Sequence, residues 1–183
     1  MKLITALVLF LISNSTFAQT KKLSVEAGIR YNLPERIYNR ELSKWDDQRG
    51  GFGFELMPKW NFSTKQSIGL NLGLNLITED ATTDDIGAFS IISFLPTYKH
   101  KIFDSKFSPF FSIGIGGYSV LNSNTSVAPG ISIGLGTTLF KKSSVSIEYN
   151  KILTKINVDE DVINGFDNWY FLGIKFSYDI GIK

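Results

Sequence analysis

The segment SIGLNLGLNL, residues 67–76, alternates apolar and small residues without a break. Leu or Ile occupies every second position, and after the first serine only glycine and asparagine stand between them. A period of two is typical of a β-strand, whose successive side chains point to opposite faces of a sheet. A strand face that meets water normally carries Lys, Glu or Thr, and neither face of this segment does. The segment therefore predicts a sheet whose solvent-facing side must be established from the rest of the chain.

The same alternation recurs along the chain, with polar residues between the repeats. The fourth of these segments is apolar on both alternate faces, so its facing stays open and a β-bulge is one interpretation of it. None of the segments shows the apolar stripe of an amphipathic helix, and the pattern predicts an all-β fold. The eight predicted strands are residues 23–33, 51–62, 67–76, 87–98, 107–120, 129–140, 144–150 and 168–180.

The predicted connections between these strands alternate in length. Tight turns are expected at 63–66, 103–106 and 141–144, whereas the intervening connections are longer, led by residues 34–50. An even number of strands with short turns at one end and long loops at the other is the plan of an outer-membrane barrel. We therefore expect an eight-stranded antiparallel up-and-down transmembrane β-barrel. Its short turns and N-terminus would face the periplasm and its long loops the cell exterior.

The residue types on the two faces indicate which one meets lipid. A soluble barrel would fill its lumen with apolar groups and coat its outside with charge. Here the minority positions are mostly Gly, Ser, Asn and Thr, which suit the crowded lumen of an eight-stranded barrel. A face dense in Leu, Ile and Phe is solvated in lipid, whereas in water it would aggregate. Aromatic residues also gather at strand ends, as two interfacial girdles require. They are Trp60, Phe62, Tyr98, Phe107 and Tyr178 beside the short turns, and Tyr31, Phe52, Trp169 and Tyr170 beside the long loops.

The first eighteen residues have the pattern of a secretory signal peptide. Lys2 precedes a short apolar run, and small residues follow it up to Ala18. We expect cleavage after Ala18, which makes residues 1–18 the signal peptide and 19–183 a single barrel domain. Cysteine is absent, so the chain lacks disulfides, a thiolate nucleophile and a lipoprotein anchor.

The last strand carries a glycine followed by two spaced aromatic residues, Gly173, Phe176 and Tyr178. With this feature, and over its mature length, the chain resembles small outer-membrane β-barrel proteins of the OmpA/OmpX type, a porin-family domain. The resemblance implies insertion by the barrel-assembly machinery. The chain departs from the commonest pattern because it runs on to Lys183 and does not end on an aromatic residue. Since nothing follows Lys183, we expect no peptidoglycan-binding domain of the kind that longer members carry.

A few charged residues interrupt the strands on the face opposite the apolar one. An isolated charge in a lumen would cost several kcal/mol, and mutual pairing offsets most of that cost. When residues are counted along each strand from the short-turn end, Arg30 and Glu55 fall at similar heights, and we predict that they pair. A second cluster of charged residues is expected closer to the short turns. We interpret the pair and the cluster as structural. The members of the cluster are Glu26, Lys59, Glu148 and Lys175.

No catalytic, cofactor or metal site is predicted. The single histidine, His100, lies beside a short turn. Lipid-modifying barrels carry their active site at the other end of the barrel, so His100 is not expected to be catalytic. The acidic stretches 79–85 and 157–168 lack the ligand spacing of calcium loops. They are interpreted as solvated loops, with divalent cations bridging them to lipopolysaccharide phosphates as the alternative.

The first long loop is a candidate contact for a protein or a glycan. It mixes charges of both signs with exposed aromatic residues, and its candidate contact residues are Tyr38, Arg40 and Trp45. Folding back onto the barrel rim is an equal alternative.

The sequence thus predicts a monomeric barrel of the Gram-negative outer membrane with a structural or surface-interaction role. An eight-stranded barrel is too narrow for a general pore. A net charge of +2 gives no field that would attract nucleic acid. Its expected partners are outer-membrane lipid and lipopolysaccharide. A lipid-modifying enzyme and an accessory subunit of a larger envelope complex are the alternatives.

Overall fold

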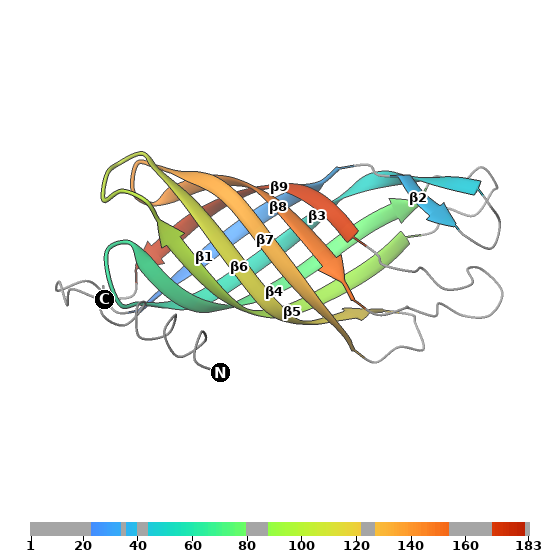
Figure 1. Cartoon of the computed structure of the whole chain (residues 1–183), viewed down its shortest axis with the longest axis horizontal. Helices are drawn as coiled ribbons and strands as arrows, with labels where there is room; N and C mark the ends of the chain where they lie inside the picture. The colour runs from blue at the N-terminus through green and yellow to red at the C-terminus, as the bar shows by residue number, and fades with distance from the viewer. Residues whose placement is uncertain are drawn as a thin grey trace, which may run out of the picture.

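The computed structural model describes most of the chain between Leu23 and Gly181 (Figure 1). The described residues are 23–33, 36–39, 44–79, 88–121, 127–153 and 170–181, with the backbone alone for 36–39, 44–49, 78–79 and 88–89. The expected signal peptide lies outside them. Across these ranges no helix is long and apolar enough to cross a membrane. The strands are β1 Leu23–Asn32, β2 Arg36–Asn39, β3 Lys44–Asn61, β4 Gln66–Glu79, β5 Ala88–Lys101, β6 Ser108–Val120, β7 Ala128–Leu139, β8 Ser143–Ile152 and β9 Tyr170–Gly181.

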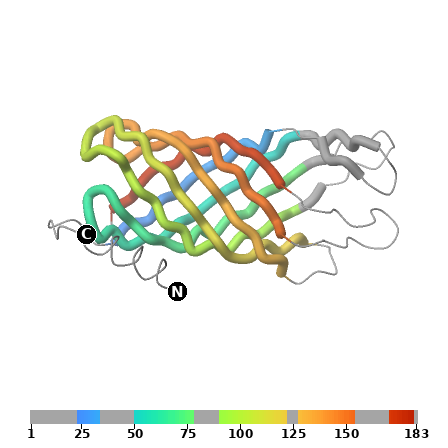
Figure 2. The backbone as a smooth tube through the Cα atoms, in the orientation of Figure 1, coloured from blue at the N-terminus to red at the C-terminus, as the bar shows by residue number. Residues whose placement is uncertain are grey.

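Eight of these strands form a closed antiparallel barrel with up-and-down topology. Each strand from β3 to β8 pairs with the next one along the chain, and β1 pairs with both β9 and β3, which closes the sheet. The short β2 pairs with the first residues of β3 and extends that hairpin beyond the barrel. In Figures 1 and 2 the strands wrap one tube, with the short turns at the end opposite β2. The predicted eight-stranded fold is confirmed, and β2 is an addition that the sequence pattern did not predict.

The alternation in β4 shows which face of the sheet is inside. Ile68 and Leu76 keep 48% and 43% of their surface exposed, whereas Asn71 and Asn75 keep 4% and 0%. The other barrel strands repeat this arrangement, with Phe52, Ile115 and Leu135 among the most exposed side chains of the outer wall. The apolar face therefore points outward and the small polar residues point toward the barrel axis.

Strand β5 has a definite facing. Leu95, Thr97 and Lys99 are buried in the lumen, while Phe94 points outward. Its ladders with β4 and β6 keep one register along their described length, so the bulge considered for this segment is not present. The irregularity lies instead in the β3–β4 ladder, between Arg49 and Gly51.

The lumen is apolar near the long-loop end, which the sequence pattern did not predict. Tyr118 packs edge-on against the ring of Phe171, at 6.2 Å between ring centroids, and donates a hydrogen bond of 3.0 Å to Asn150 Oδ1. The strand termini at this end thus enclose a small core, and the charged part of the lumen begins below it. The core residues are Ile77, Ile91, Leu95, Tyr118, Val120, Ala128, Ile152 and Phe171.

Candidate functional site

The candidate site is a network of charged side chains that point into the lumen, here called the lumen network. Its four cations and four carboxylates come from five strands, and their formal charges cancel. Seven of the eight residues keep at most 7% of their surface exposed, and Asp179, at the short-turn end, is partly open. The members are Arg30, Lys59, Lys99, Lys175, Glu26, Glu55, Glu148 and Asp179.

The upper group of the network joins β1, β3, β8 and β9. Arg30 Nη2 forms ion pairs with the carboxylates of both Glu55 and Glu148. Lys175 pairs with the same two carboxylates, at 3.1 Å from Glu55 Oε2. Asn71 Nδ2 adds a hydrogen bond of 3.0 Å to Glu55 Oε2. Each cation in this group therefore touches two carboxylates, and each carboxylate touches two cations.

The lower group is built around Glu26. Its carboxylate accepts hydrogen bonds from Lys59 at 2.7 Å, from Lys99 at 2.9 Å and from the Ser177 hydroxyl at 2.7 Å. Lys59 also reaches Asp179 at 2.8 Å. Because buried carboxylates are costly unless their lone pairs are filled, these donors explain how Glu26 can lie in the lumen.

The structure brings the six predicted lumen residues together but groups them differently. Arg30 and Glu55 are paired, and so are Glu26 and Lys59. The prediction that Glu148 and Lys175 share the lower cluster is wrong, since both belong to the upper group. The strands of a closed barrel tilt and stagger, so residues at equal counts from the turn lie at different heights. Lys175 consequently faces Arg30 across the β1–β9 ladder.

Two members of the network were missed in the sequence. Lys99 lies on β5, the strand whose alternation gave no facing, so no signal placed it inside. Asp179 has the same parity along β9 as Lys175 and Ser177, and this signal could have found it. Lys99 also lies 4.0 Å from the ring centroid of Phe110, which covers its ammonium group from β6.

Glycines in the barrel wall make room for the charged side chains. A Cβ on Gly134 would meet Ser112 Oγ and would lie 3.2 Å from Glu148 Cγ. A Cβ on Gly173 would lie 2.7 Å from Arg30 Cδ. Cavity space inside the network is small, since the void between the two groups measures about 10 Å³. A void of this size is at the lower limit for holding a single water molecule.

The single histidine lies on the outer face of β5 and not in a turn. His100 Nδ1 is 3.2 Å from the Tyr98 hydroxyl, and its ring lies 5.3 Å from that of Phe111. In the described part of the chain, its contacts are therefore aromatic. No three acidic, His or Cys side chains among these residues converge as a metal ligand set.

The loop residues predicted as contacts lie largely outside the residues that the structure describes. Tyr38 stands opposite Trp45 in the β2–β3 ladder, which places their backbones side by side. Their side chains and all of Arg40 lie outside the described residues. So do residues 80–85 and 157–168, which make up nearly all of the two acidic stretches.

No family model and no curated protein matches the chain. Among solved structures it is similar to the outer membrane enzyme PagL, with 12% identity over 86% of this chain and 99% of that one and a TM-score of 0.48. It is also similar to the outer membrane protein OprG from Pseudomonas aeruginosa, with 14% identity, coverage of 88% and 96%, and a TM-score of 0.46. The de novo designed TMB2.3 matches at 11% identity, coverage of 88% and 97%, and a TM-score of 0.41. Similarity this low does not assign the activity of any of these proteins to this chain.

Proposed function

We propose that this chain is a monomeric structural barrel of the bacterial outer membrane, with a lumen closed by ion pairs and no enzymatic role. The observation that carries the proposal is the bridge between Lys99 and Glu26. Lys99 comes from β5 and Glu26 from β1, which are separated by two strands on one side of the barrel and four on the other. The pair therefore spans the lumen and closes it to ions.

The outer wall supports the membrane location. Exposed Leu, Ile and Phe side chains surround the barrel, and contiguous apolar surface of this extent is an aggregation risk in water. Closure of the barrel leaves none of its eight described wall strands as a free edge, as hydrocarbon requires. Both properties fit a lipid environment.

Aromatic side chains near both ends of the barrel support the same location. Toward the short turns, neighbouring rings from Trp60 through Phe62, Tyr98 and Phe111 follow one another at 6.1 to 6.4 Å between centroids. At the opposite end, Tyr31 and Phe52 lie 5.3 Å apart, and Tyr149 and Tyr170 lie 5.8 Å apart. Aromatic belts at two levels are typical of barrels that cross a bilayer.

The proposal extends to orientation and partners. We propose that the short turns face the periplasm, that the barrel-assembly machinery inserts the chain, and that lipid and lipopolysaccharide surround it. Contacts of the long loops with a protein or a glycan belong to the same proposal. The enzyme and accessory-subunit alternatives stay open to test.

Conductance in a planar bilayer tests the closed lumen. The refolded protein should give no stepwise ionic current, whereas the double variant Glu26→Ala with Lys99→Ala should leak. Ser132→Ala is the matched control, because Ser132 is buried in the lumen but lies outside the ion-pair bridges. Large current steps from the unaltered protein would refute the proposal. Release of fatty acid from labelled lipopolysaccharide or phospholipid would refute the non-enzymatic part.

A further inference from the structure

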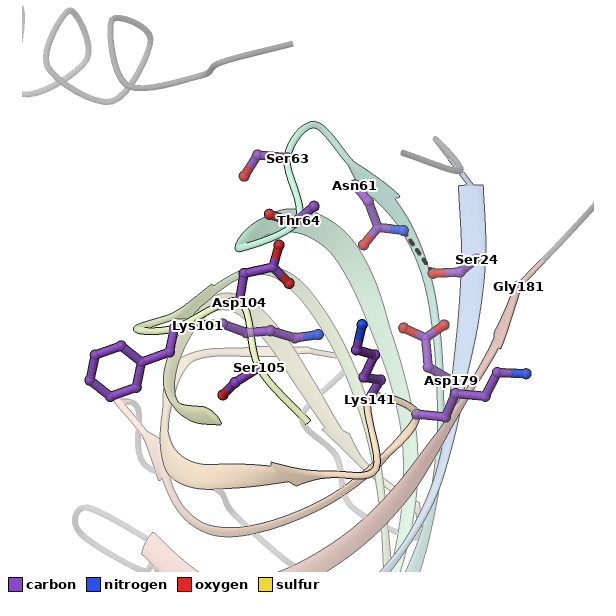
Figure 3. A pocket seen from close by; sticks show the side chains of 12 residues that line it. Ser24, Asn61, Ser63, Thr64, Lys101, Asp104, Ser105, Lys141, Asp179 and Gly181 are labelled. Carbon is purple, nitrogen blue, oxygen red and sulfur yellow. Dashed lines mark hydrogen bonds between the residues drawn. The ribbon is translucent and has the colours of Figure 1, made fainter. Parts of the chain in front are cut away.

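A pocket of about 540 Å³ opens at the short-turn mouth of the barrel (Figure 3). It is here called the mouth pocket. Its walls come from the turns after β3, β5 and β7 and from the ends of β1 and β9. It lies beyond Asp179, where the lumen network ends, and is separate from the apolar core at the other end.

The mouth pocket carries an excess of positive charge. Lys101, Lys141 and Lys142 line it, and in Figure 3 the ammonium groups of Lys101 and Lys141 point into it. Among the described residues, neither of these two ammonium groups has a carboxylate within ion-pair distance. Of the two acidic residues on the wall, Asp179 is already paired with Lys59, which leaves Asp104 against the ammonium groups of Lys101 and Lys141, since that of Lys142 lies over the Tyr178 ring.

Hydroxyl groups on the wall add neutral hydrogen-bond donors. Ser24 Oγ accepts a hydrogen bond of 2.9 Å from Asn61 Nδ2, so its own hydrogen is free to donate. Ser63 Oγ likewise accepts from the backbone N–H groups of Lys65 and Gln66, at 3.2 and 2.9 Å. An oxyanion entering the pocket would thus meet charged and neutral donors together.

Backbone hydrogen bonds hold the two lysines in place. The N–H of Lys101 donates to the carbonyl of Lys65 at 2.7 Å, which ties the end of β5 to the turn after β3. The N–H of Lys141 donates to the carbonyl of Lys106 at 3.3 Å, which ties the two remaining short turns together. Because these turns are linked, binding needs little additional ordering of the backbone.

We propose that the mouth pocket binds a phosphate group, through Lys101 and Lys141 with help from the hydroxyl donors. Cations with hydrogen-bond donors are the chemistry that recognises phosphate oxygens. The volume exceeds that of a bare phosphate and lies in the usual range for small-molecule sites. Inorganic phosphate and the phosphodiester head group of a phospholipid share this chemistry. The inference does not depend on the barrel's orientation or on its lacking an activity.

Calorimetric titration of the full barrel in alkyl maltoside micelles, which contain no phosphate, tests the site. Inorganic phosphate is the first probe, and glycerophosphoglycerol, a soluble phosphodiester, is the second. Saturable binding of either probe is the expected result, with affinity that falls as salt rises. Tighter binding of the diester assigns the pocket to a lipid head group, and tighter binding of inorganic phosphate assigns it to the free anion.

Variants separate the pocket from general positive charge. The double variant Lys101→Gln with Lys141→Gln should weaken binding by about tenfold or more, the loss expected for charge-assisted hydrogen bonds. The matched control is Lys65→Gln with Lys106→Gln, two exposed turn lysines outside the pocket, and it should bind normally. Lys101→Arg with Lys141→Arg keeps both charges and should also bind. Absence of saturable binding by the unaltered protein, or equal loss in the control, would overturn the proposal.

Discussion

Lys175 lies directly opposite Arg30 across the β1–β9 ladder, so two cations face each other inside the barrel. Glu55 and Glu148 separate them, and each carboxylate pairs with both cations. Like charges opposite each other destabilise a sheet unless counter-charges intervene. The four residues are consequently interdependent, and the loss of one leaves another without its full complement of partners.

Removal of one carboxylate should therefore destabilise the barrel strongly. Glu148→Gln leaves Arg30 and Lys175 with Glu55 alone, and we expect a loss of about 3–5 kcal/mol in the free energy of unfolding. Urea unfolding in lipid vesicles, followed by tryptophan fluorescence, measures it. Ser132→Ala serves as a buried control that removes no charge. A loss of less than about 1 kcal/mol would show that the group is not interdependent.

The Arg30–Glu55 pair can be measured separately by a double-mutant cycle. Arg30→Gln and Glu55→Gln should each destabilise the barrel, and the double variant should lose less than their sum. We expect a coupling free energy of about 1–3 kcal/mol, because the two groups touch and both are buried in the lumen. The same unfolding assay gives the four values of the cycle. Strict additivity would mean that the contact contributes nothing.

Gly134 tests the close packing of the lumen. Gly134→Ala places a methyl group against Ser112 Oγ and Glu148 Cγ, and overpacking of this kind costs about 1–3 kcal/mol. Ser112→Ala in the same chain removes the nearer atom and should restore part of the loss. Unfolding midpoints of the single and double variants provide the comparison. A single variant as stable as the starting protein would indicate a loosely filled lumen.

The turn between β7 and β8 contains a strained backbone. Lys141 has a φ of 69°, a left-handed conformation that glycine adopts without steric cost. Lys141→Gly should raise stability by up to about 1 kcal/mol, since the left-handed conformation costs other residues about that much. The change also removes a lysine of the mouth pocket, so phosphate affinity should fall while stability rises. Lys142→Gly is the control, and it should lower stability because Lys142 is not in a left-handed conformation.

The apolar outer wall should reject charge at mid-height. Ile113 points outward near the middle of β6, and Ile113→Arg should cost about 2–4 kcal/mol in a bilayer. Phe103→Arg places the same charge in an exposed turn and should cost far less. Folding yield and unfolding free energy in vesicles distinguish the two variants. Equal tolerance of both changes would mean that the wall faces water.

The fold could be predicted from the sequence because the two faces of most strands differ sharply in residue type. The alternation from Ile68 to Leu76 shows this, since every apolar side chain there points outward and the asparagines point inward. Strand β5 is the exception, because Ile91 and Leu95 belong to the apolar core near the long-loop end. Its inner and outer faces are both apolar over this stretch, and the sequence offers no contrast between them.

The lumen network was less predictable, because it depends on how far along the barrel axis each charged residue lies. The sequence gives the facing of Glu148 and Lys175 but not the stagger between neighbouring strands, which sets which charges meet. Lys99 could not be placed without the facing of β5. The strained turn at Lys141 and the mouth pocket depend on backbone conformation at the rim, which no alternation pattern encodes.

The bridges from β1 have a consequence for biogenesis. Glu26 and Arg30 lie on the first strand of the barrel, and their ion-pair partners come from strands that follow later in the chain, β3, β5 and β8. Without β8 and β9, Arg30 would keep only one of its two carboxylates, and three cations of the network would face two carboxylates. The last hairpin adds Glu148, Lys175 and Asp179, so the charges of the network balance only when the final two strands are in place.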